Sequence, residues 1–172
     1  ERNEADLFVT LFYGVLDGRT GQVTYCNAGH EPPLLLQAKT DGSINVQRTL
    51  TTKGLPLGLV PDAQFESGSL QMNPADDLVL FTDGITEAEN NYNHVFSGAT
   101  LNALLARQTS SAPEDIIRSV LRNVQAFTGD HPQSDDITLM VVRYDGEPLE
   151  GVKEDSDGED GLLSPKLRVV GN

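Results

Sequence analysis

The chain has 172 residues, of which 38% are hydrophobic, and a formal net charge of −14. This length is enough for one domain with a buried core, and the acidic balance argues against nucleic acid or an anionic membrane as a partner. No apolar run approaches the roughly 18 residues that indicate a transmembrane segment, and the lone Cys26 excludes an internal disulfide and fits a reducing cytoplasm.

The first third of the chain predicts antiparallel strands. Residues 7–16 are rich in β-branched and aromatic side chains, and residues 22–26 resume this pattern after a short gap that contains glycines. The short gap favours a β-hairpin. Residues 34–37 and 44–50 read as two further strands, separated by a turn at Asp41-Gly42.

The middle of the chain predicts a loop followed by two strands. Residues 54–58, GLPLG, cannot form a regular helix or a central strand, because the proline lacks a donor and the glycines loosen the backbone. Residues 64–72 alternate weakly, which favours an edge strand. Residues 73–76 form a turn that leads into a short buried strand at 78–81.

The last third predicts helices and one more strand. Residues 101–105 place three leucines on one helical face. Ser111 to Glu114, with Pro113 in the first turn, resembles a capping box at the start of a second, amphipathic helix that Gly129 ends. Apolar residues recur there at three- and four-residue spacing: Ile116, Ile117, Val120, Leu121, Val124 and Phe127. We expect the helix to pack on the sheet through Ile116, Val120, Val124 and Phe127. Residues 137–144 form the last predicted strand.

The chain ends in an acidic segment. Residues 145–172 hold eight acidic and three basic side chains, and residues 145–160 are expected to be a flexible tail or linker. We therefore divide the chain into a domain at 1–144 and a tail at 145–172.

Two aspartates stand beside the predicted buried strands. Asp83 follows the strand at 78–81, and Asp135 precedes the strand at 137–144. If these strands are antiparallel neighbours, both carboxylates lie at one rim of the sheet and can share a hard divalent cation. Gly84 permits a sharp turn and leaves room beside Asp83. The alternative is that Asp83 only caps a helix that begins near residue 85.

Four motifs in this order resemble the SpoIIE/RsbU branch of the metal-dependent protein serine/threonine phosphatases. They are NAGHEPP, GLPLG, FTDGITEA and SDDITLMVVR, and the resemblance covers about residues 7–143. It implies an α+β fold, a largely antiparallel β-sandwich flanked by helices. It also implies two Mn²⁺ or Mg²⁺ ions at one rim and a water, held by these ions, that attacks the phosphorus of a phosphoserine or phosphothreonine.

The resemblance also assigns residues. Asp83 and Asp135 match metal ligands, and no catalytic residue beyond the metal ligands is implied. Asp136 is expected behind the ligands or as a backbone cap. Glu87, one helical turn after Asp83, either orients a ligand or only sits in the first turn of a helix. From the NAGH motif, Asn27, Gly29 and His30 either position a loop near the site or have a core or turn role.

One motif of the family is absent. An earlier acidic stretch of the form GDVSGHG supplies further ligands in the family, and this sequence does not contain it. We expect it upstream of Glu1, so that this chain resembles the C-terminal two-thirds of the domain with the N-terminal part missing. The fragment by itself is then expected to be inactive, and an uncovered sheet edge favours a homodimer.

The leading interpretation is therefore a cytoplasmic phosphatase domain that dephosphorylates a regulatory phosphoprotein. In this family the substrate is typically an STAS-domain anti-sigma-factor antagonist. The alternative is a non-catalytic, pseudophosphatase module that binds such a partner in partner-switching signalling.

Overall fold

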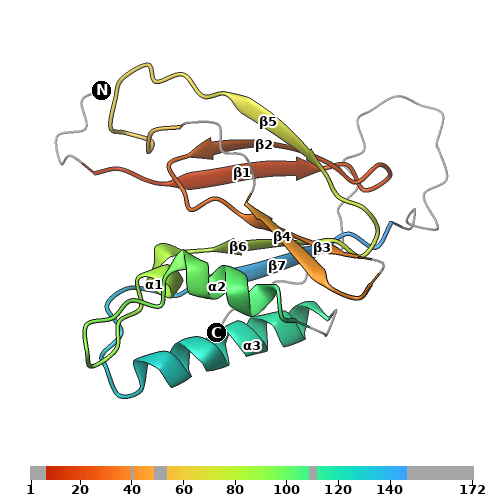
Figure 1. The fold of residues 1–172 in the computed structure, drawn as a ribbon. Helices are drawn as coiled ribbons and strands as arrows, with labels where there is room; N and C mark the ends of the chain where they lie inside the picture. Colours follow the sequence, from red (N-terminus) through yellow and green to blue (C-terminus); the bar gives the residue numbers. More distant parts are fainter. Residues whose placement is uncertain (1–6, 40, 49–53, 109–111, 147–172) are drawn as a thin grey trace, which may run out of the picture.

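The computed structural model describes residues 7–39, 41–48, 54–108 and 112–146. Figure 1 shows three layers: a three-stranded sheet, a four-stranded sheet, and helices on the far side of the second sheet. The α+β class with antiparallel sheets is confirmed. Within the described residues the helices lie along one side of the sandwich.

The strands and helices follow one another in the order predicted. They are β1 (Leu11–Leu16), β2 (Gln22–Ala28), β3 (Leu34–Ala38), β4 (Ile44–Arg48), β5 (Ser67–Gln71), β6 (Asp77–Phe81), α1 (Asp83–Thr86), α2 (Gly98–Leu105), α3 (Pro113–Thr128) and β7 (Leu139–Arg143).

The first sheet has the order β1-β2-β5, and both pairs are antiparallel. The predicted hairpin of β1 and β2 is confirmed, and β5 is an edge strand as expected. β1 begins at Leu11, later than predicted, although Val9 forms an isolated bridge with Leu57. β2 runs to Ala28, two residues further than predicted, and so carries the start of the NAGH motif.

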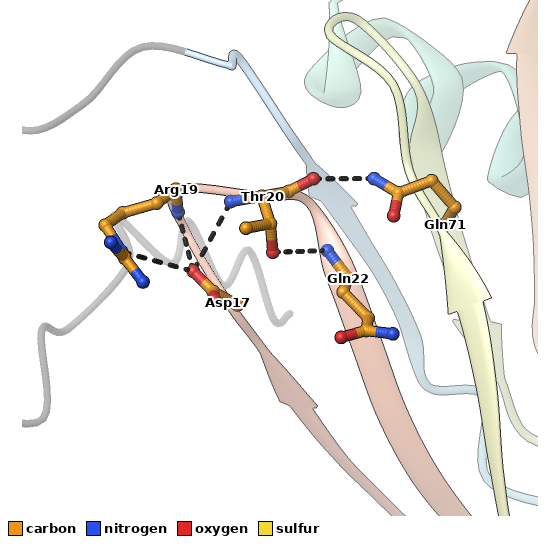
Figure 2. Close-up of polar contacts among 5 residues, drawn as sticks. All are labelled: Asp17, Arg19, Thr20, Gln22 and Gln71. Atoms are coloured by element: carbon orange, nitrogen blue, oxygen red, sulfur yellow. Dashed lines mark hydrogen bonds and ion pairs between the residues drawn. The ribbon is translucent and has the colours of Figure 1, made fainter.

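The turn between β1 and β2 is closed by polar contacts, which Figure 2 shows. Asp17 Oδ1 accepts a hydrogen bond of 2.9 Å from the Arg19 backbone N–H and a longer one of 3.4 Å from that of Thr20. The bond from Arg19 is the main reason that the pKa of Asp17 is lowered. Gln71 of β5 donates to the Thr20 carbonyl at 2.6 Å, which joins the turn to the third strand of the sheet.

The second sheet has the order β4-β3-β6-β7, with all pairs antiparallel. Phe81 at the end of β6 lies opposite Leu139 at the start of β7, and Val79 lies opposite Leu34 at the start of β3. As a result, the segments at 27–33, 82–84 and 135–138 meet at one rim.

The opposite rim is held by a buried ion pair. Arg143 donates two hydrogen bonds to the Asp77 carboxylate, at 2.9 and 2.6 Å, and the Asp77 side chain is 6% exposed. Burial raises the pKa of Asp77, and the hydrogen bond and charge of Arg143 only partly oppose that shift.

The core has two parts because side chains alternate across the second sheet. One part fills the space between that sheet and the helices, where Val79 and Phe81 of β6 meet α3. The other lies between the two sheets, where Leu78 contributes. The predicted face of α3 is confirmed: Ile116, Val120 and Val124 are buried there, and Phe127 packs against them.

The two ends of α3 agree only partly with the sequence. Gly129 ends the helix with a positive φ of 58°, as predicted. At the start, Pro113 is the first helical residue, as expected, but Ala112 occupies the N-cap position and has no side-chain acceptor. The predicted capping box depends on Ser111, a residue that lies outside the described part of the chain.

Apart from Asp145 and Gly146, the tail at 145–172 lies outside the described residues, as do the last two residues of the fourth predicted strand. None of the described helices is long and apolar enough to cross a membrane.

Candidate metal site at one rim of the sandwich

Asp83 and Asp135 lie at the same rim of the second sheet. Asp83 is the first residue of α1 and comes two residues after β6, and Asp135 comes four residues before β7. The two strands are antiparallel neighbours, which is the arrangement on which the shared-site hypothesis depended.

Thr82 joins the two segments beyond the ends of the strands. Its hydroxyl donates to the Asp136 carbonyl at 2.9 Å and accepts from the Thr138 N–H at 2.9 Å. The Thr82 N–H also donates to the Thr138 carbonyl at 3.1 Å. Sequence analysis missed this residue. A threonine directly before a helix suggests an N-cap, but Thr82 makes no side-chain cap hydrogen bond and binds the neighbouring segment instead.

Gly84 is required by the close approach of the two segments. A Cβ atom at this position would lie 2.5 Å from the Asp136 carbonyl oxygen and 3.2 Å from that of Asp135. The room that the sequence predicted beside Asp83 is therefore filled by the backbone of the second acidic segment.

Both candidate carboxylates are exposed. Within the described residues, the Asp83 carboxylate has no hydrogen bond or ion pair, and Asp135 Oδ1 accepts from the Asp136 N–H at 2.7 Å. Thr82, not Asp83, occupies the N-cap position of α1. The alternative in which Asp83 caps the helix is therefore wrong, and its carboxylate remains available as a ligand.

The donor set fits a hard cation, because carboxylate oxygens are the ligands that Mg²⁺ and Mn²⁺ prefer. Two carboxylates with several waters can hold one such ion. No group of three or more His, Cys, Asp or Glu residues suited to a metal occurs in the described part of the chain. Asp136 and Glu87 are exposed near this rim, and their carboxylates have no hydrogen bond or ion pair with described residues.

The NAGH motif forms a turn at the same rim. The buried Asn27 side chain donates to the His30 carbonyl at 2.9 Å and accepts from the His30 N–H at 2.8 Å. Gly29 has a φ of 76°, which favours glycine. The structure shows the turn, and it places that turn at the same rim as the two acidic segments.

A cleft of about 1000 Å³ opens beside this rim. Its polar edge includes residues of both acidic segments and of the NAGH turn, although neither Asp83 nor Asp135 lines it, and its floor is apolar. The polar lining comprises His30, Thr82, Glu89, Gln125, Thr128, His131, Gln133, Ser134, Asp136 and Thr138. The floor includes Leu11 and Phe12 of β1, Leu80 of β6 and Met140 of β7.

The family model and the curated relatives that match this chain agree on its family. The family model described as Stage II sporulation protein E (SpoIIE) matches residues 1–145. Phosphoserine phosphatase RsbU of Bacillus subtilis is 29% identical over 140 residues, which is 81% of this chain and 40% of RsbU.

Two solved structures share the fold. The RsbU and RsbW domains of Rv1364c from Mycobacterium tuberculosis superpose with a TM-score of 0.64 at 32% identity, over 81% of this chain and 37% of that one. The Mn-presoaked phosphatase domain of SpoIIE from Bacillus subtilis gives a TM-score of 0.61 at 18% identity, over 86% of this chain and 62% of that one. The second likeness concerns the fold alone.

The chain spans only part of these relatives. It covers between 22% and 40% of the length of three curated proteins that it resembles.

Proposed function

Because this chain belongs to the SpoIIE family and is a phosphatase domain of the SpoIIE/RsbU type, we propose that it hydrolyses a phosphoserine or phosphothreonine ester on a regulatory protein and that this reaction requires Mn²⁺ or Mg²⁺. The observation that carries the proposal is that the segments of Asp83 and Asp135 lie side by side at one rim, where β6 and β7 are antiparallel neighbours and Thr82 bonds to Asp136.

Each residue at the rim has a defined part in the proposal. Asp83 and Asp135 hold the metal. Thr82 and Gly84 keep the two acidic segments close together. A bound divalent ion would lower the pKa of its water and stabilise the charge that develops on the phosphate. Asp136 and Glu87 are proposed to lie behind the ligands and to orient them.

The name of one relative supports the substrate, because RsbU is a phosphoserine phosphatase. We propose that the partner is an STAS-type antagonist that carries a phosphoserine. We also propose a location in the cytoplasm, because a chain with a single cysteine fits a reducing compartment.

Self-association is also part of the proposal. β1 is an edge strand, and Leu11, Tyr13 and Val15 are 44, 61 and 48% exposed along it. An exposed apolar edge strand is a common site of strand pairing between chains. Analytical ultracentrifugation tests this: a strictly monomeric chain at all concentrations would contradict it.

The non-catalytic alternative is favoured by one observation. The described residues contain no group of three or more His, Cys, Asp or Glu residues suited to a metal, and a site for two ions needs additional ligands, including a group that bridges them. For the same reason, we propose that residues 1–172 alone turn over substrate near background, and that additional ligands come from elsewhere in the full-length protein.

The test is phosphate release from a phosphoserine protein with excess Mn²⁺. The full-length protein is expected to be active, to lose activity with a chelator, and to lose it again in Asp83→Asn. A full-length protein that binds its partner but releases no phosphate would establish the non-catalytic module. Robust turnover by residues 1–172, abolished in Asp83→Asn, would show that two carboxylates suffice.

A further inference from the structure

Two motifs that the metal site leaves unexplained, NAGH and GLPLG, pack directly on each other at the rim. A Cβ atom at Gly29 would lie 2.7 Å from ring atoms of Pro56, and one at Gly54 would overlap the carbonyl oxygen of Asn27. Any larger residue at either position would therefore push the two loops apart.

The N-terminal end of the first sheet completes this cluster. Val9 and Leu57 exchange two backbone hydrogen bonds, of 2.9 and 2.8 Å. The next residue, Thr10, places its hydroxyl 3.4 Å from Nδ1 of His30. We call residues 9–10, 27–30 and 54–58 the loop cluster.

The loop cluster fixes His30. Its backbone N–H and carbonyl both bind the side chain of Asn27, which is 3% exposed. A buried amide that satisfies both groups of one residue holds the backbone of that residue in a single conformation. When Nδ1 of the neutral ring accepts the Thr10 hydroxyl, Nε2 carries the proton and is a donor.

The cleft beside the rim is short of positive charge. Among the described residues that line it there is no lysine or arginine, and Glu89 and Asp136 are acidic. Only His30 and His131 can present a cationic donor there. The His131 ring lies 3.0 Å from the carbonyl of Pro132 in its own loop, whereas His30 is held by Asn27 of its own turn and contacts Thr10 of a separate segment.

We infer that His30 is a substrate-binding residue that donates a hydrogen bond to the phosphate group of the substrate, and that Asn27 is the positioning residue that holds it there. This inference rests on the proposed phosphatase function. A phosphate dianion that enters an acidic cleft needs a donor besides the metal, and a hydrogen bond to a charged oxygen is among the stronger ones.

The test is steady-state kinetics of the full-length protein with Mn²⁺, using a phosphoserine peptide and p-nitrophenyl phosphate. His30→Ala should raise KM about 10-fold for both substrates and change kcat less than about 3-fold, because the lost contact is to the phosphate that both share. His30→Phe, which keeps a ring but has no N–H donor, and competitive inhibition by inorganic phosphate give the same comparison if His30→Ala folds poorly. His94→Ala, an exposed histidine outside the cleft, is the control and should leave KM unchanged.

The role of Asn27 is tested by a double-mutant cycle. Asn27→Ala should raise KM in the wild-type background and add little in the His30→Ala background, since it acts through His30. A full additional increase would overturn the positioning role. Two outcomes would overturn the phosphate contact. One is a KM that is unchanged in His30→Ala or that rises in this variant only for the peptide. The other is a KM that rises in His131→Ala and not in His30→Ala. A wild type without Mn²⁺-dependent turnover would instead overturn the proposed function on which the inference rests.

Discussion

Thr82 and Asp136 are 54 residues apart in the sequence, and the Thr82 hydroxyl donates a hydrogen bond of 2.9 Å to the Asp136 carbonyl. The same hydroxyl accepts from Thr138. This one side chain therefore ties the segment that carries Asp83 to the segment that carries Asp135.

Replacing Thr82 with valine should loosen that tie. The change keeps the shape of the side chain but removes one donor and one acceptor, so we expect a loss of about 1 kcal/mol in the free energy of unfolding and weaker Mn²⁺ binding. Chemical denaturation and calorimetric titration measure the two effects. Thr82→Ser keeps the hydroxyl and should retain most of both. A valine variant with unchanged Mn²⁺ affinity would show that the tie does not position the carboxylates.

Gly84→Ala should be more damaging than its small size suggests. The added Cβ would meet the Asp136 carbonyl at 2.5 Å, so the two acidic segments would have to move apart. We expect a loss of about 1–3 kcal/mol in stability and reduced metal binding. Gly98→Ala is the matched control, because its Cβ would meet no atom closer than 3.9 Å. Equal behaviour of the two variants would contradict the account.

Val120→Asp tests the packing of α3. Val120 is fully buried between the helix and the second sheet, so the substitution buries an unpaired charge and should destabilise by several kcal/mol. Ala126→Asp, at an exposed position of the same helix, should cost under about 1 kcal/mol. Thermal denaturation of both variants checks this. A small effect at Val120 would mean that α3 is not docked as described.

The buried pair of Asp77 and Arg143 should affect stability as a function of pH. Burial raises the pKa of Asp77 above its ordinary value of 3.8. The folded state then binds this proton more tightly than the unfolded state, so the contribution of Asp77 to stability is complete below the ordinary pKa and is lost as pH rises through the raised one. Denaturation midpoints measured from pH 3.5 upward should show this loss, and Asp77→Asn should remove it. The exposed Asp130→Asn should keep it. If the denaturation midpoint instead rises as pH is raised from 3.5, and Asp77→Asn removes that rise, the pKa of Asp77 is not raised in the folded state.

The strands, the helices and the two acidic positions could be predicted from the sequence because they depend on local patterns. The run at 78–81 ends at Asp83, and apolar spacing marks the buried face of α3. Antiparallel pairing of two such strands then places Asp83 and Asp135 at one rim.

Contacts between distant segments could not be predicted in this way. The bond from Thr82 to Asp136 depends on the exact register of β6 against β7, and the overlap of Gly54 with Asn27 depends on how two loops meet. Neither leaves a periodic signal in the sequence.

The central claim is that Asp83 and Asp135 hold one divalent ion between them, and paramagnetic broadening by Mn²⁺ in amide NMR spectra of residues 1–172 tests it most directly. At substoichiometric Mn²⁺, the account predicts that the amide signals of Gly84 and Ile85 and those of residues 135–138 broaden together and first. It also predicts that Asp83→Asn and Asp135→Asn each abolish the broadening at both segments. Broadening that is confined to the acidic residues 145–160, or that persists at 135–138 when Asp83 is replaced, would contradict the claim.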